Sequence, residues 1–174
     1  MSVQITGGSA DQQGLIRQAH TQAISLATAA QAAAQAGGAT FTLWFGAGST
    51  STVAANFGQI LAALNSYAWT YDLGTMTDSP VVESVFVSPK TVDATAGAVT
   101  SIIWKGLFMQ ATTAAAQRMA ALSIVHVCAE VREGWSNMIF VETAADAQCY
   151  ATLDPAGAAT SPRNYMEYAG AVTP

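Results

Sequence analysis

Apolar residues recur three and four residues apart over several long stretches of the chain, which is the spacing of a helix with one buried face. Asp11 is the expected cap of the first helix and Gly37-Gly38 its end. A second helix is expected to begin at Ser51 or Thr52. The remaining predicted helices cover Thr113–Glu133 (stopped by Gly134), Glu142–Leu153, and a last segment from the Ser161-Pro162 cap to about Ala169.

Shorter stretches rich in β-branched and aromatic residues predict strands at Thr40–Phe45, Ala68–Asp72, Val81–Val87 and Thr100–Trp104. Loops are expected at Lys90–Ala98 and Gly106–Thr112. Because helices dominate and the strands cluster mid-chain, the pattern predicts an α+β fold. It is mostly helical with a small central β-sheet, in a single domain over residues 1–174.

The composition indicates a folded protein and excludes some classes of binding partner. Of the 174 residues, 51% are hydrophobic and 10% charged, which excludes a solvated disordered chain. The net charge is −5, and the six Lys and Arg residues are scattered, so neither nucleic acid nor an anionic membrane surface is an expected partner. No apolar run is long enough for a transmembrane segment. The first residues lack a secretory signal peptide, so synthesis in the cytoplasm is expected.

The candidate chemistry centres on His126 and Glu130 in the long helix. Residues four apart share a helix face, so the imidazole and the carboxylate either bond to each other or hold one metal ion together; a core histidine is the remaining alternative. Cys128 points away from that face and cannot pair with His126. Cys128 and Cys149 are too few for a disulfide framework; we expect buried free thiols, with one bridge or a reactive thiol as the alternative.

The tract from His126 to Asn137 resembles a degenerate H-E-x-x-H zinc-peptidase helix followed by G-T-x-D. Other segments extend the likeness in the same order: T-L-W-F-G at residues 42–46, S-T-V-A-A-N-F at 51–57, Tyr71-Asp72, I-I-W-K-G-L-F at 102–108, and the stretch 151–169. Over residues 10–170 the chain resembles the aspzincins, the deuterolysin and peptidyl-Lys metalloendopeptidase family. The resemblance implies a zincin-like fold.

The departures from that family pattern fall on the catalytic positions. The family's three zinc ligands correspond to His126, Glu130 and Asn137, vestigial positions in which the neutral Asn137 is a poor ligand. Val127 stands where the family has its general-base glutamate. Losing such a base typically costs about 10²–10⁴ in rate. The resemblance also implies a cleft lined by Val127, Gly134, Trp135 and Met138, in which Trp135 is expected to fill the space beside the old metal site.

The sequence therefore predicts a pseudopeptidase: no catalytic residues, no cofactor, and a surface reused to bind a protein. The suggested setting is a secreted bacterial virulence effector exported without a Sec signal, for example by type VI secretion. Its partner would be a host or competitor protein or the secretion carrier. The alternative is a metal-dependent hydrolase in which zinc is held by His126, Glu130 and a third ligand, with Glu133 or Asp146 as a substitute carboxylate. A purely structural or immunity-type protein is a further option.

Overall fold

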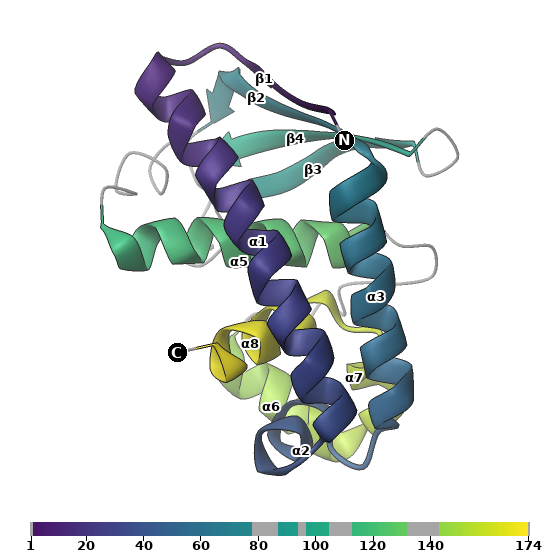
Figure 1. Ribbon diagram of the computed structural model, residues 1–174. Helices are drawn as coiled ribbons and strands as arrows, with labels where there is room; N and C mark the ends of the chain where they lie inside the picture. Colours follow the sequence, from purple (N-terminus) through teal and green to yellow (C-terminus); the bar gives the residue numbers. More distant parts are fainter. Residues whose placement is uncertain (1, 78–86, 94–96, 105–112, 132–142, 174) are drawn as a thin grey trace.

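Figure 1 shows the computed structural model, with a small sheet at one end and helices running away from it. The structure describes residues 2–77, 87–93, 97–104, 113–131 and 143–173. The long helices α1 (Ala10–Ala36) and α3 (Thr50–Ser66) lie side by side, and α5 (Ala114–Glu130) crosses beneath the sheet. The far end holds α2 (Ala39–Phe45), α6 (Ala144–Leu153), α7 (Pro155–Ala158) and α8 (Pro162–Val172).

The N-cap of α1 is Ser9, two residues before the predicted cap Asp11, because Ser9 makes a capping box. The Ser9 hydroxyl accepts from the Gln12 backbone N–H, and the Gln12 side-chain oxygen accepts from the Ser9 N–H at 2.8 Å. Asp11 lies in the first turn instead, where its charge still complements the helix dipole. The predicted end is confirmed, since Gly37 follows the helix at φ 70.

The predicted second helix is confirmed as α3, which begins slightly earlier because Ser49 is its cap. Its buried face carries Val53, Phe57, Ile60 and Leu64, with Leu61 half-buried beside them. The face lies along α1, where alanines at positions such as 23, 27 and 30 are fully buried. Small side chains let the two helix backbones approach closely.

The strand expected at Thr40–Phe45 is wrong: this segment is the helix α2. Its buried aromatic residues, Phe41, Trp44 and Phe45, lie at positions i, i+3 and i+4, which a helix places on one face. Phe41 and Phe45 pack edge-on against Tyr168 of α8 at centroid distances of 6.1 and 5.3 Å. Tertiary packing thus overrides the strand preference of this segment.

The sheet has the strand order β1-β2-β4-β3. Strands β1 (Ser2–Thr6), β2 (Ala68–Thr77) and β4 (Ala98–Trp104) are parallel neighbours, and β3 (Val87–Asp93) pairs antiparallel with β4 at the end of this order. The predictions at Ala68–Asp72 and Thr100–Trp104 are confirmed, whereas β1 was not anticipated.

The loop expected at Lys90–Ala98 is wrong over its first part, because β3 continues to Asp93. The ladder to β4 shifts register between Pro89 and Thr91, and such an irregularity in an outer strand accommodates a residue without an N–H. Residues 81–86 of the strand expected at Val81–Val87 lie outside the described part of the chain, as does most of the loop expected at Gly106–Thr112.

The three C-terminal helices expected from the sequence are α5, α6 and α8. Thr113 caps α5, which ends at Glu130 with Val131 as its C-cap, so the predicted end at Glu133 is too late. Thr143 caps α6, and Ser161 followed by Pro162 opens α8 as predicted, although α8 continues to Val172. The structure confirms a mostly helical α+β fold with a small sheet.

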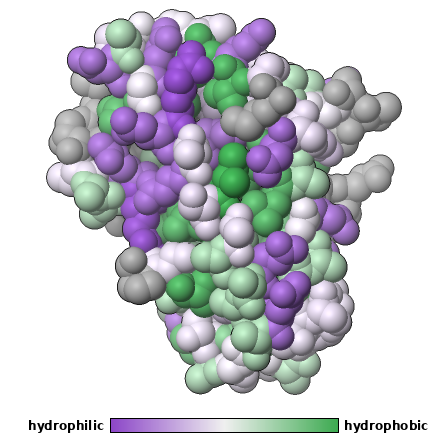
Figure 2. All heavy atoms as spheres, in the orientation of Figure 1, coloured by the Kyte–Doolittle hydropathy of each residue, from purple (hydrophilic) through white to green (hydrophobic). Residues whose placement is uncertain are grey.

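Neither Cys128 nor Cys149 is in a disulfide, as expected, but only Cys128 is buried; Cys149 is exposed on α6. In Figure 2, apolar side chains on the face turned to the viewer gather along the middle, whereas the region over the start of α1 is mostly polar. Among the helices that the structure describes, none combines the length and apolarity needed to cross a membrane.

Candidate functional site: the His126–Glu130 pair on helix α5

His126 and Glu130 meet on one side of α5. Nε2 of His126 lies 3.4 Å from Oε1 of Glu130, and the two side chains are 8% and 22% exposed. The i, i+4 spacing brings them together as the sequence predicted. The pair is therefore a largely buried imidazole–carboxylate contact with its carboxylate end open to solvent.

Val127, the residue at the position of the expected general base, is fully buried in the core. Its aliphatic side chain cannot accept a proton. The other residues assigned to the cleft and ligand set, Gly134, Trp135, Asn137 and Met138, lie outside the described residues. Their roles remain predictions.

Asp146 is not brought into the pair on α5. It closes the capping box at the start of α6, where its carboxylate accepts from the Thr143 N–H at 2.9 Å and the Thr143 hydroxyl at 2.7 Å. No group of three His, Cys, Asp or Glu side chains suited to a metal occurs among the described residues. The other candidate carboxylate, Glu133, lies outside them.

The donor set on α5 fits zinc only in part. Two ligands at tetrahedral angles, each about 2.0–2.2 Å from zinc, lie about 3.4 Å apart. The observed 3.4 Å between His126 and Glu130 agrees with that spacing. Catalytic zinc sites use three protein ligands, however, and the described residues bring two together. His126 and Glu130, as the structure describes them, therefore do not complete a catalytic zinc site.

A second histidine, His20 of α1, is held in the core by two hydrogen bonds. Its Nε2 donates to the Leu64 carbonyl oxygen of α3 at 3.1 Å, so Nδ1 is the acceptor for the Tyr71 hydroxyl of β2 at 2.7 Å. Burial lowers the pKa of His20, and the Leu64 hydrogen bond offsets part of that effect. Burial raises the pKa of Tyr71 well above its ordinary value, with a further contribution from Cys128.

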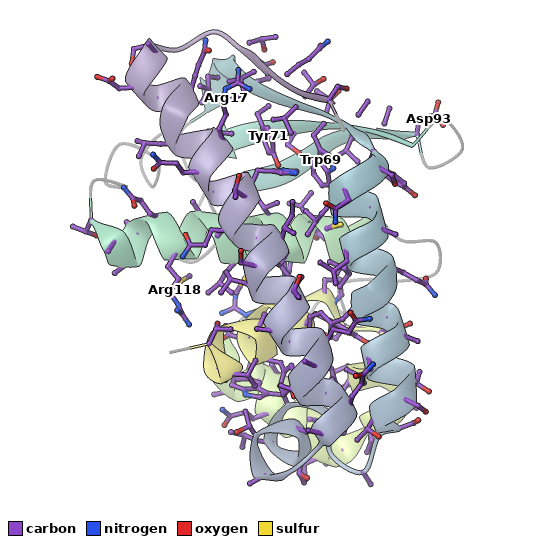
Figure 3. The ribbon with its side chains drawn as sticks, in the orientation of Figure 1. Arg17, Trp69, Tyr71, Asp93 and Arg118 are labelled. Atoms are coloured by element: carbon purple, nitrogen blue, oxygen red, sulfur yellow. The ribbon has the colours of Figure 1, made fainter. Side chains whose placement is uncertain are left out.

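This cluster joins three elements and has no open face. Trp69 and Tyr71, labelled in Figure 3, project from β2 toward α1 and α3, and both are fully buried. His20 packs edge-on against the two rings at 5.6 and 5.9 Å. No role for His20 was predicted from the sequence; the available signal was its position in the apolar face of α1. The arrangement is that of a structural core histidine.

A further charged pair, which the sequence analysis also missed, lies on α8. Arg163 and Glu167 are four residues apart with a 2.5 Å contact between Nη2 and Oε1, and their side chains are 7% and 21% exposed. The signal available in the sequence was this i, i+4 spacing of opposite charges. A buried guanidinium needs such a partner, because the uncompensated charge is costly inside a protein.

Two hollows lie at the end of the molecule away from the sheet. One, of about 710 Å³, lies between α2 and α6 and includes the exposed Leu43 and Cys149. The other, of about 570 Å³, lies beside α7 and includes the exposed Leu153. Neither includes His126 or Glu130, so they are separate from the pair on α5.

The fold has a known counterpart. A solved structure, the zinc peptidase from Grifola frondosa, superposes with a TM-score of 0.68 over 93% of this chain and 96% of its own. This chain has the fold of a zinc peptidase. The two sequences are 20% identical, so the likeness establishes the fold and not the activity. No family model matches the sequence, and no curated protein does.

Proposed function

We propose that the protein is a pseudopeptidase: a protein-binding module that keeps the zinc-peptidase fold without peptidase chemistry. The observation that carries the proposal is Val127, a buried aliphatic residue immediately after His126 on α5. In the resemblance to the aspzincins this is the general-base position. The ligand set is weakened as well, because Glu130 and Asn137 stand at two of the three ligand positions. The base and part of the ligand set are therefore both lost.

The binding role draws support from the sheet. β3 is one of the two outer strands among the four that the structure describes; it pairs with β4 on one side, and α5 lies against it. An outer strand offers backbone donors and acceptors to an extended peptide. The partner proposed is therefore a protein: a host or competitor target, or the carrier of an export apparatus such as type VI secretion. The proposal treats residues 1–174 as one domain, in line with the 93% coverage of the fold match.

One observation favours a second candidate, a metal-dependent hydrolase with a rearranged site. The 3.4 Å between His126 Nε2 and Glu130 Oε1 suits two ligands of one zinc ion. A third ligand would have to come from another side chain, for which the sequence offers Asn137.

Elemental mass spectrometry of tag-free protein separates the two candidates. The pseudopeptidase predicts that wild type and His126→Ala carry the same low zinc content. The hydrolase predicts one equivalent of zinc in wild type that is lost in the variant. Circular dichroism of both proteins verifies that the substitution leaves the fold intact.

A further inference from the structure

The face of α5 that carries His126 and Glu130 continues as one stripe along the helix. Arg118, Leu122, His126 and Glu130 follow one another at intervals of four residues. On α8, Arg163, Glu167 and Gly170 likewise lie at i, i+4 and i+7. Each stripe thus combines a charged pair with residues at its other end that contact the opposite helix.

The two stripes face each other where the start of α5 contacts the end of α8. Nη2 of Arg118 donates to the Gly170 carbonyl oxygen at 2.8 Å and to the Thr173 hydroxyl at 3.2 Å. Arg118 projects from α5 on the side of α8 (Figure 3). A Cβ placed on Gly170 would lie 3.3 Å from a methyl group of Leu122. The first half of the α5 stripe therefore faces the last turns of α8.

Contacts with α3 fix the relative direction of the two helices. Near the end of α5, the Cys128 thiol donates to the Ile60 carbonyl oxygen of α3. Near the start of α8, the Tyr165 hydroxyl accepts from Asn56 of α3 at 2.9 Å. The end of α5 and the start of α8 thus share α3 as a neighbour, so the helices run antiparallel. Arg163, two turns before Gly170, is then level with the part of α5 two turns after Leu122, where Glu130 lies.

We propose that the guanidinium of Arg163 is the resident positive charge of the His126–Glu130 site. It takes the place of the zinc ion that the resemblance to the aspzincins assigns to these positions. The inference rests on the proposed pseudopeptidase function and deepens it, because it gives the site a counter-charge built into the chain. Glu167 holds the guanidinium in place on α8. A fixed cation beside Glu130 stabilises the carboxylate and repels an incoming dication in this largely buried setting.

Zinc titration calorimetry on tag-free protein tests the proposal. Removing the charge in Arg163→Met should raise zinc affinity at least about tenfold over wild type, because the repulsion of the dication is gone while the His126–Glu130 pair stays. Adding His126→Ala to this variant should abolish the gain. Arg163→Lys, which keeps the charge, should bind zinc as weakly as wild type.

Arg118→Met is the matched control. It removes the same kind of side chain from the same pair of helices, but twelve residues, or about 18 Å of helix, before Glu130. It should leave zinc affinity unchanged. If Arg163→Met fails to fold, Arg163→Met/Glu167→Met replaces the ion pair by apolar side chains and gives the same expected gain.

Unchanged zinc affinity in the folded Arg163 variants would overturn the inference, as would a wild type that binds zinc as tightly as they do. The proposed function fails on a different result, namely zinc-dependent peptide cleavage by the wild-type protein. The two failures are therefore distinguishable.

Discussion

The Tyr71 hydroxyl lies 2.7 Å from Nδ1 of His20, inside the core and 51 residues away along the chain. With the bond from His20 to the Leu64 carbonyl, this contact ties β2 to α1 and α3. In the neutral form Nε2 donates to Leu64 and Nδ1 accepts from Tyr71. Protonated His20 would have to donate from Nδ1 instead, which deprives the buried Tyr71 hydroxyl of this acceptor. The cluster therefore couples the stability of the fold to the charge of one residue.

Replacing Tyr71 by Phe removes the donor and leaves Nδ1 of His20 buried without its hydrogen bond. We expect a loss of about 1–3 kcal/mol in the free energy of unfolding, the usual cost of an unsatisfied buried polar group. Urea denaturation followed by circular dichroism measures it. Tyr67→Phe, at a half-buried position just before β2, is the control and should change stability little. An equal loss in both variants would contradict the account.

Because burial lowers the pKa of His20, the unfolded chain takes up a proton at that residue more readily than the folded one. Stability should therefore fall as pH decreases below about 6.5, by up to about 1.4 kcal/mol per pH unit, until the lowered pKa is reached. Urea midpoints between pH 7 and pH 5 test this. His20→Gln, less stable at pH 7, should lack this part of the slope; an identical slope in both proteins would assign the titration to other groups.

Gly46 ends α2 at φ 56, and a Cβ there would collide with the carbonyl oxygen of Ala151 in α6. Gly46→Ala should cost at least about 1–2 kcal/mol from the left-handed backbone alone, with the collision adding to it. Gly14→Ala is the matched control, because nothing lies within 4 Å of its Cβ position in α1. It should stabilise the protein by about 0.5–1 kcal/mol. Thermal melts of the two variants should thus shift in opposite directions.

Asn164 anchors α8 to two other helices. Its side-chain N–H groups donate to the carbonyl oxygens of Trp44 at 2.7 Å and Ala147 at 2.9 Å, and the residue is fully buried. Asn164→Ala should lower the free energy of unfolding by about 1–3 kcal/mol. Asn164→Asp, which sets a carboxylate against two carbonyl oxygens, should be worse. Chemical denaturation compares them, and an Asp variant as stable as wild type would contradict these bonds.

Local signals predicted the elements whose packing face repeats over several turns. Helices α3 and α8 carry such faces and side-chain caps, and both were recognised. The short α2 was read as a strand because Thr and Phe residues favour strands locally, while the burial of Phe41 and Phe45 against α8 depends on residues more than 100 positions away. The extent of β3 depends on pairing with β4, which no local pattern records.

The candidate site shows the same difference between features set by local spacing and features set by packing. The His126–Glu130 contact follows from helical spacing and was predicted, since both residues belong to one helix. The proposed place of Arg163 beside Glu130 follows from the antiparallel packing of α8 on α5, and a sequence pattern contains no such information. His20 was overlooked for the same reason, because its partners come from α3 and β2.

The central claim is that this zinc-peptidase fold is without peptidase activity. Its most direct test is incubation of tag-free wild-type protein with zinc and a mixed peptide library, with cleavage read by mass spectrometry beside His126→Ala. The account predicts the same peptide spectrum for both proteins and for the library alone. Zinc-dependent cleavage by the wild type that disappears in His126→Ala would contradict it and establish a working site on α5.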